Sequence, residues 1–255
     1  MLVVFIGAGN LATHLALEMS RKGLRVGQVY SRTEESAADL ARQLDCAWTI
    51  DPQAIRSDGD LYVFAVKDAA LPAVISQLKP NNGLWVHTAG SMPMDIFKGY
   101  TSRYGVFYPL QTFSKRRSVD FSQIPVFLEA AREEDLNVLS EVAQQLSDHV
   151  EILSSEKRKR LHLAAVFANN FTNHMYVLAG KILEKEHLPI DVLRPLIDET
   201  AAKIHDMPPL QAQTGPAVRY DENVINKQLD MLTDPQMKAL YQLISQNIHK
   251  EATNE

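Results

Sequence analysis

Short apolar runs alternate with amphipathic stretches along residues 1–153. The apolar runs have the length of buried strands, and the stretches between them repeat apolar residues at helical spacing. We expect strands at Leu2–Ile6, Arg25–Tyr30, Cys46–Thr49, Asp60–Val66, Gly83–Thr88, Tyr104–Phe107, Pro125–Leu128 and Val150–Leu153. Helices are predicted at Asn10–Arg21, Glu34–Leu44, Asp68–Leu78 and Glu133–Ser147. This alternation favours an α/β fold in which parallel strands are joined by right-handed crossovers.

The pattern changes after Leu153, where helical spacing continues and strand-like runs stop. A long helix is predicted from Ser154 or Ser155 to the break at His187-Leu188-Pro189. Further helices are predicted at Ile190–Asp206, Tyr220–Leu232 and Pro235–Glu251. We therefore place a domain boundary at Leu153 and expect an α/β domain over residues 1–153 and an all-α domain over residues 154–255.

A glycine-rich turn joins the first predicted strand to the first predicted helix. Its residues are Gly7, Ala8, Gly9, Asn10, Leu11 and Ala12. Gly7 permits a tight turn, Gly9 leaves room for a pyrophosphate, and Ala12 allows close packing of the helix on the strand. Backbone N–H groups at the start of the helix would then face the phosphates. The turn predicts a Rossmann dinucleotide site, and the alternative is a tight turn that binds nothing.

The end of the second predicted strand indicates which dinucleotide binds. A site for NAD usually carries an acidic residue there, whereas this strand ends in Ser31, Arg32 and Thr33. A guanidinium can pair with a 2′-phosphate through two hydrogen bonds. We therefore expect NADP as the cofactor. The alternative is that Arg32 only pairs with Glu34 or Glu35 at the start of the next helix.

Composition excludes several other classes of protein. The net charge of −5 argues against nucleic acid as a partner. Cys46 is the only cysteine, so no disulfide forms within the chain, and no cluster of cysteine and histidine has the spacing of a metal site. No apolar run has the length of a membrane span, and the N-terminal run is too short for a signal peptide. We expect a cytoplasmic protein that acts on a small molecule.

These motifs resemble the superfamily of pyrroline-carboxylate reductase and 6-phosphogluconate dehydrogenase-like proteins. A narrower resemblance is to Rossmann-like NADP oxidoreductases whose C-terminal domain has no assigned function. The superfamily resemblance rests on Val4–Ala12, Tyr30–Thr33 and Phe64–Asp68. The narrower one rests on His87–Ser91, Gly105–Phe113, Leu161–Asn170 and Thr214–Pro216. The resemblance implies that Ala65, Val66 and Lys67 lie beside the dinucleotide. It also implies an all-α C-terminal domain like that of 6-phosphogluconate dehydrogenase, which forms a homodimer; the apolar circumference of the long helix supports the same expectation.

One feature departs from the superfamily. Its hydroxyacid dehydrogenases carry a catalytic lysine one helical turn before an asparagine, but Ala165 and Val166 stand one turn before Asn169 and Asn170. We therefore expect an NADP-dependent oxidoreductase of another kind, with an unidentified substrate in a cleft between the domains. The alternatives are a non-catalytic NADP sensor, which the absent lysine favours, and a deazaflavin-linked NADP reductase.

Three residues are candidates for the chemistry. His87 ends a predicted strand, where ligands of open α/β sheets bind, so it is a candidate acid or base. Asn170 and His162 lie on the long helix and are candidates for contacts with the nicotinamide or the substrate. Each has a structural alternative: His87 would bond backbone groups at the strand end, and the helix residues would bond backbone groups elsewhere.

Overall fold

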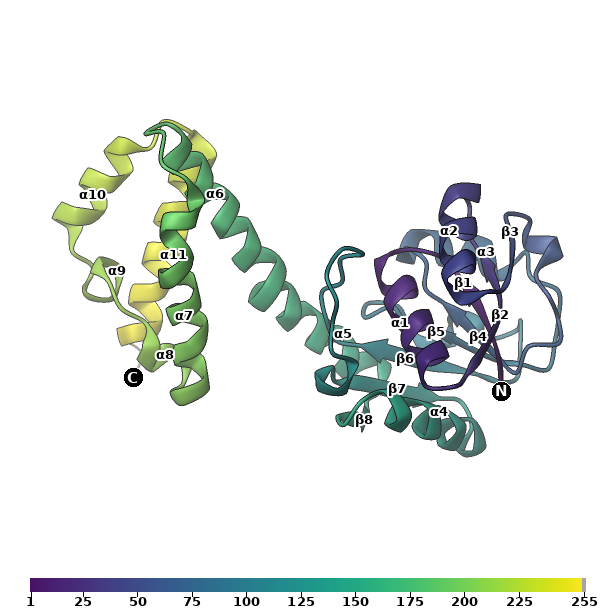
Figure 1. Ribbon diagram of the computed structural model, residues 1–255. Helices are drawn as coiled ribbons and strands as arrows, with labels where there is room; N and C mark the ends of the chain where they lie inside the picture. The colour runs from purple at the N-terminus through teal and green to yellow at the C-terminus, as the bar shows by residue number, and fades with distance from the viewer. Residues whose placement is uncertain (254–255) are drawn as a thin grey trace. The chain divides into compact units, whose positions relative to one another are not determined.

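An eight-stranded sheet organises the first part of the protein in the computed structural model, which describes residues 1–253 (Figure 1). The strands lie in the order β3-β2-β1-β4-β5-β6-β7-β8. Their bounds are β1 Leu2–Ile6, β2 Arg25–Tyr30, β3 Ala47–Thr49, β4 Leu61–Phe64, β5 Leu84–His87, β6 Tyr104–Pro109, β7 Val126–Ala130 and β8 Val150–Ile152. All eight predicted strands are confirmed. The inner strands are the apolar runs expected of a sheet covered on both faces, whereas β3 and β8 at the two edges are three residues long and partly exposed.

Helices cover the two faces of this sheet. They are α1 Asn10–Arg21, α2 Glu34–Leu44, α3 Leu71–Ile75 and α4 Glu133–Leu146. The helix predicted over residues 68–78 is shorter than expected: a 3₁₀ turn, Asp68–Ala70, precedes α3, with Pro72 at the second position of the helix. Because proline lacks an N–H and fixes φ, it suits the first turn of a helix and not its interior.

The direction of β7 corrects the expectation of parallel strands throughout. β7 pairs antiparallel with β6, from Gly105↔Ala130 to Pro109↔Val126, while β8 pairs parallel with β7. The segment between β6 and β7 holds only a short 3₁₀ turn, Phe121–Gln123. Parallel pairing requires a crossover, usually a helix, so a connection without one is consistent with reversal of the strand.

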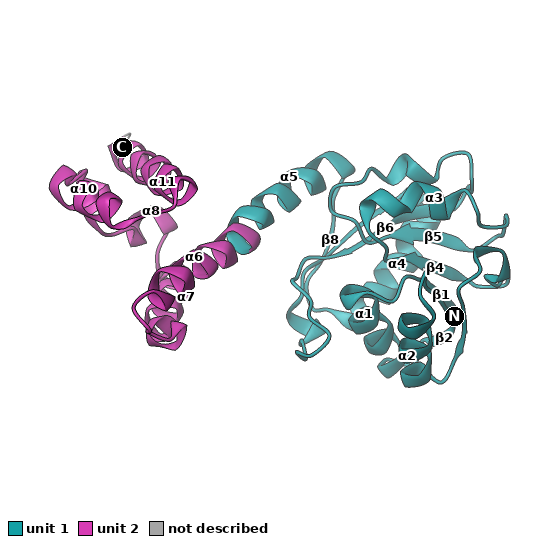
Figure 2. Cartoon of the chain, turned by 90° about the horizontal axis from the view of Figure 1, so that it is seen from above, with its two compact units in different colours: residues 1–169 teal, residues 170–255 magenta. Residues whose placement is uncertain are grey.

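The chain divides into two compact units, residues 1–169 and residues 170–255 (Figure 2). The sheet ends at Ile152, and α5, Ser155–Ala165, follows within unit 1. The division falls in a π-helical turn, Val166–Phe171, which connects α5 to α6. It lies sixteen residues beyond the boundary expected at Leu153.

Unit 2 consists of helices and short connections, with no strand among its described residues. Its helices are α6 Thr172–Glu184, α7 Arg194–Asp206, α8 Pro209–Ala212, α9 Pro216–Arg219, α10 Glu222–Met231 and α11 Pro235–Thr253. Asp221 starts α10 by accepting a hydrogen bond from the Val224 N–H at 3.3 Å. Gly215, with a φ of 106°, turns the chain into α9. None of the helices described in residues 1–253 is long and apolar enough to cross a bilayer.

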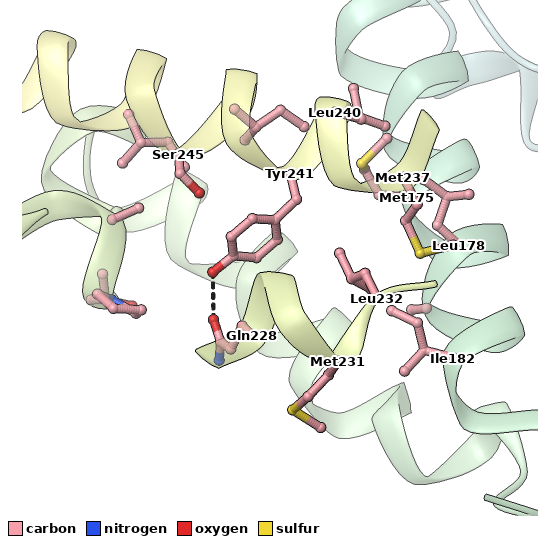
Figure 3. Close-up of a pocket in the computed structure, with 16 residues that line it drawn as sticks. Met175, Leu178, Ile182, Gln228, Met231, Leu232, Met237, Leu240, Tyr241 and Ser245 are labelled. Carbon is pink, nitrogen blue, oxygen red and sulfur yellow. Dashed lines mark hydrogen bonds between the residues drawn. The ribbon is translucent and has the colours of Figure 1, made fainter. Parts of the chain in front are cut away.

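A pocket of about 610 Å³ opens among the helices of unit 2 (Figure 3). Its lining is almost entirely apolar and includes Met175 from α6 together with Met231 and Met237. The Tyr241 hydroxyl donates a hydrogen bond to Gln228 Oε1 at 2.5 Å within this lining. The pocket shows that these helices leave space among their own apolar side chains.

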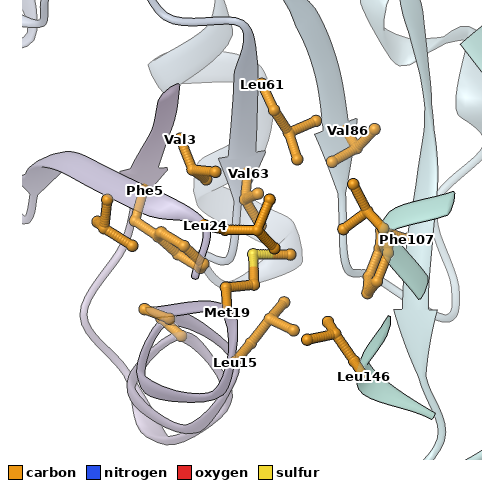
Figure 4. Packing of buried hydrophobic residues seen from close by; sticks show 14 of the residues in the cluster. Val3, Phe5, Leu15, Met19, Leu24, Leu61, Val63, Val86, Phe107 and Leu146 are labelled. Atoms are coloured by element: carbon orange, nitrogen blue, oxygen red, sulfur yellow. The ribbon is translucent and has the colours of Figure 1, made fainter. Parts of the chain in front are cut away.

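The clusters of buried hydrophobic residues lie in unit 1 (Figure 4). One cluster packs α1, α2 and α4 against one face of the sheet, with Leu15 and Met19 of α1 on Phe5. The other packs α3 and the 3₁₀ turn Met94–Phe97 against the opposite face, around Phe64 and Trp85. Both faces of the inner strands are thus buried, while the edge strands β3 and β8 are partly exposed. Ligands of such sheets bind at the carboxyl ends of the strands.

Cys46 directly precedes β3, and its side chain is half-buried. Burial, and secondarily the charge of Asp45, raises the pKa of its thiol to about 11. The side chain therefore behaves as a small apolar group at neutral pH.

Candidate functional site

A cavity of about 390 Å³ lies at the carboxyl ends of β1, β2 and β4. It is lined by Gly7, Ala8, Gly9, Tyr30, Ser31, Arg32, Thr33, Ser36, Ala65, Val66, Lys67, Ala70 and Val74. Nine of the eleven residues expected to bind the cofactor are therefore in one lining. Three separate loops contribute them, and the parallel register of β2, β1 and β4 brings the loops to one edge.

The shape of the glycine turn leaves room for a ligand. Gly7 has a φ of 122°, and its N–H donates to the Tyr30 carbonyl at 2.7 Å. A Cβ on Gly7 would lie 2.2 Å from the carbonyl oxygen of Ala65, so only glycine lets the two loops approach this closely. A Cβ on Gly9 would meet no atom within 4 Å. The turn is thus closed on its protein side and open beside Gly9.

The start of α1 suits a phosphate. Gly9 is the N-cap, no side chain caps the first turn, and that turn contains no acidic residue. The N–H groups of the first turn can therefore donate to a ligand, and the helix dipole favours an anion there. Arg32 is exposed in the lining of the cavity, and no ion pair joins it to Glu34 or Glu35 among the described residues. The residues present fit a dinucleotide that carries an additional phosphate.

Asn10 and Leu11 lie outside the lining of the cavity. The Asn10 side-chain amide donates a hydrogen bond to the Phe113 carbonyl at 2.9 Å. Leu11 packs against the hydrophobic cluster beneath α1. In this structure both side chains fix the glycine turn to the rest of unit 1.

His87 is fully buried at the end of β5, and both ring nitrogens have backbone partners. Nδ1 accepts a hydrogen bond from the Ala89 N–H at 3.2 Å, and Nε2 donates to the Pro93 carbonyl at 3.3 Å. Burial lowers the pKa of the ring to about 3, and the charge of Arg158 acts in the same direction. This geometry favours the structural alternative for His87, a neutral ring that shapes the loop after β5.

A tyrosine and a histidine meet at the end of β6. The Tyr108 hydroxyl lies 3.0 Å from Nδ1 of His162 on α5, and the two rings pack edge to face. A Cβ on Gly90 would lie 2.5 Å from Nδ1 of His162, so a glycine is needed to admit the ring. Burial raises the pKa of Tyr108; the charge of Arg158 opposes this rise and that of Asp68 adds to it. Tyr108 is therefore a neutral phenol at neutral pH.

Arg158, one helical turn before His162, forms a buried ion pair with Glu129 of β7 at 2.6 Å. Its guanidinium also donates to the Met92 carbonyl at 2.5 Å. Glu129 accepts further hydrogen bonds from the N–H and hydroxyl of Ser155 at 2.8 and 2.7 Å. This network ties the start of α5 to β7 and to the loop after β5. It holds His162 in place.

Sequence reasoning missed Tyr108, although it lies at the end of a predicted strand within a motif that carried the resemblance. The Ser91 hydroxyl donates to the carboxylate of Asp68, which follows the cavity residue Lys67. Asp68, Ser91, Tyr108 and His162 thus form a polar group at the same edge of the sheet as the cavity. Asn170 is the first residue of unit 2 and lies exposed in the π-helical turn, so its role stays a prediction.

Two family models match the chain. The first, described as an NADP oxidoreductase that depends on coenzyme F420, matches residues 2–86, which contain the whole lining of the cavity. The second, a domain of unknown function named DUF2520, matches residues 124–248. No curated protein matches the chain.

Solved structures share the whole fold. A Bacteroides fragilis protein described as a candidate NADP oxidoreductase is 52% identical over 98% of each chain, with a TM-score of 0.92. A Thermotoga maritima protein is 26% identical over 98% of this chain and 99% of its own, with a TM-score of 0.81. A reductive aminase from Aspergillus terreus, solved with NADPH and ethyl-5-oxohexanoate, shares the fold at 14% identity, over 98% of this chain and 93% of its own, with a TM-score of 0.73. The chain therefore belongs to the family of NADP oxidoreductases that join this dinucleotide-binding domain to a DUF2520 domain.

Proposed function

We propose that this NADP oxidoreductase transfers a hydride between NADP(H), held by its glycine turn, and a small molecule that receives a proton from Tyr108. The observation that carries the proposal is the cavity of about 390 Å³ that collects the glycine turn, Ser31–Thr33 and Ala65–Lys67. Bound NADPH supplies the hydride, so the protein has only to bind the cofactor, orient the substrate beside it and protonate the substrate.

Different residues of the cavity bind different parts of the dinucleotide. N–H groups at the start of α1 hold the pyrophosphate, and the open space beside Gly9 admits it. Arg32 pairs with the 2′-phosphate, and the hydroxyls of Ser31 and Thr33 assist. Ala65 and Val66 present backbone and apolar surface to the remaining part of the nucleotide.

Tyr108 and His162 handle the proton. Because its pKa is raised, Tyr108 keeps its proton at neutral pH and can donate it to an oxygen or nitrogen that gains negative charge. His162 fixes the phenol through the 3.0 Å contact and stabilises the charge that remains on it. The Arg158–Glu129 ion pair holds the helix that carries His162, so it positions the pair without touching substrate.

The test is a screen for NADPH oxidation at 340 nm against small imines, oxo acids and aldehydes, with coenzyme F420 included because the matching family model names it. With a substrate in hand, Tyr108→Phe should lower kcat by about 10²–10³-fold, the usual effect of losing one donor to a developing charge. NADPH affinity should change by less than about threefold, a difference of under 1 kcal/mol.

Tyr104→Phe is the matched control, since it removes a hydroxyl from the first residue of the same strand, four residues before Tyr108, where the ring packs on Phe97. It should retain wild-type kcat. Equal activity of the wild type and Tyr108→Phe would refute the assignment of the proton donor. If NADPH binds but no compound is turned over, a sensor of NADP becomes the better description.

We also infer that unit 2 pairs with a second copy of the chain. Among its described residues only Ile225 and Ser245 are buried. Large apolar side chains instead face outward, among them Val177, Leu188, Val192, Leu196, Ile204, Met231 and Leu243. So many exposed apolar groups on one helical unit are typical of an interface between subunits.

A further inference from the structure

A cluster of three cations follows β6 and has no part in the function proposed above. Lys115, Arg116 and Arg117 are all exposed, and we name them with Ser114 the basic loop. The Arg117 N–H donates to the Ser114 carbonyl at 3.0 Å, which closes the loop as a turn. Within residues 1–253 no ion pair joins the three cations to a carboxylate. Their charge therefore remains available to a ligand.

The basic loop is fastened to the start of α1. Asn10 donates to the Phe113 carbonyl at 2.9 Å, and Nε2 of His14 lies 3.0 Å from the Ser114 carbonyl. The Phe113 ring lies 5.6 Å from the His14 ring and stacks on buried Phe121 at 5.9 Å. Since Asn10 directly follows the glycine turn, these contacts hold the cations beside the phosphate end of the cavity, where the loop after β6 stands next to α1 (Figure 1).

The charge at this place is opposite in sign to that of the whole chain. The chain carries a net charge of −5, yet the basic loop adds three positive charges to the positive end of the α1 dipole. Glu18 of α1 is paired with Arg21. Asp120 follows the loop by three residues and keeps its negative charge, because the hydrogen bonds from Ser122, one from the hydroxyl at 2.8 Å, lower its pKa. One carboxylate against three cations leaves the basic loop with a positive balance.

We propose that the basic loop attracts the phosphates of an incoming dinucleotide and steers them to the glycine turn. The proposal rests on the proposed function, in which the glycine turn holds NADP(H). A set of like charges beside a site raises the association rate through long-range attraction, and salt screens that attraction. The cations need no contact with the bound dinucleotide, so they act on association and not on dissociation.

Stopped-flow measurement of NADPH binding tests this at low and high salt. The variant replaces Lys115, Arg116 and Arg117 with glutamine. The matched control replaces three exposed lysines elsewhere, Lys79→Gln, Lys98→Gln and Lys227→Gln, which changes the net charge equally. At low salt the loop variant should associate about fivefold more slowly or worse, within the range known for electrostatic steering. At high salt it should match the wild type, and its dissociation rate should stay within about twofold.

Three results would each overturn the steering role. They are an association rate equal to that of the control, a slower association that persists at high salt, and a change that lies in the dissociation rate. The wild type provides a second measurement without any substitution, because its association rate must fall steeply as salt rises. Failure of the wild-type protein to bind NADPH would instead refute the proposed function itself. Normal NADPH association by the variant would leave the proposed function intact and refute only the role of the basic loop.

Discussion

Acidification should destabilise unit 1 through one side chain, His87. This ring is fully buried, and its pKa in the folded protein is about 3, against about 6.5 in an unfolded chain. The folded state therefore excludes a proton that the unfolded state binds. The resulting stability is complete above pH 6.5 and is lost as the pH falls toward 3.

The loss between pH 7 and pH 5 follows from these two values. At pH 5 the unfolded chain protonates His87 almost fully, while the folded protein leaves it neutral. Protonation favours the unfolded state over the folded state by a factor that is about 25 times larger at pH 5 than at pH 7. The free energy of unfolding therefore falls by about 2 kcal/mol over this interval. Carboxylates add their own pH dependence, so the contribution of His87 has to be isolated by substitution.

Urea denaturation followed by tryptophan fluorescence provides the assay, since Trp85 is buried on the same strand as His87. His87→Gln removes the imidazole and keeps an amide that can serve the Ala89 and Pro93 partners. Its free energy of unfolding should fall by about 2 kcal/mol less than that of the wild type between pH 7 and pH 5. His149→Gln removes an exposed imidazole from the same unit and should reproduce the wild-type loss. Equal losses in wild type and His87→Gln would refute the buried, neutral assignment.

Three further predictions concern the cofactor and the assembly. Arg32→Ala should weaken NADPH binding about tenfold or more and leave NADH binding nearly unchanged in calorimetric titrations, because it removes a charge-assisted phosphate contact. Arg42→Ala, which removes an exposed guanidinium from α2, should change neither titration. Gly9→Ala should lower NADPH affinity at least about tenfold, since the new Cβ meets no protein atom and only a ligand would contact it. Its urea midpoint should fall only slightly, because alanine is a poorer N-cap than glycine; a large loss of stability would contradict this explanation. The wild type should sediment as a dimer at tens of micromolar and the pair Leu196→Glu, Leu243→Glu as a monomer, because charges would enter an apolar interface. A monomeric wild type would refute the inferred second copy.

The strands and the cofactor cavity were accessible from the sequence because local pattern determines both. An apolar run such as Leu2–Ile6 predicts a buried strand by itself, and the glycine turn has a fixed place after it. The reversed direction of β7 was not accessible, because an apolar run has the same composition in either direction. Only the missing helix between Pro109 and Val126 hinted at it.

The polar group at the end of β6 could be found only from the tertiary structure. Tyr108 and His162 are 54 positions apart in the sequence. Their contact depends on Gly90, because a side chain there would clash with the His162 ring. The sequence placed His87 at the end of a strand but did not show how deeply its ring is buried, so an exposed catalytic ring and a buried structural ring were equally compatible with it. Burial and two backbone partners distinguish them.

The high pKa of Cys46 makes the protein suitable for labelling at a chosen position. At neutral pH an exposed cysteine has about 300 times more thiolate than a thiol with a pKa of about 11. A cysteine introduced at Ser118, just after the basic loop, would therefore react with a fluorescent maleimide long before Cys46 does. One dye would then report the arrival of a nucleotide beside the basic loop, with the native thiol left in place.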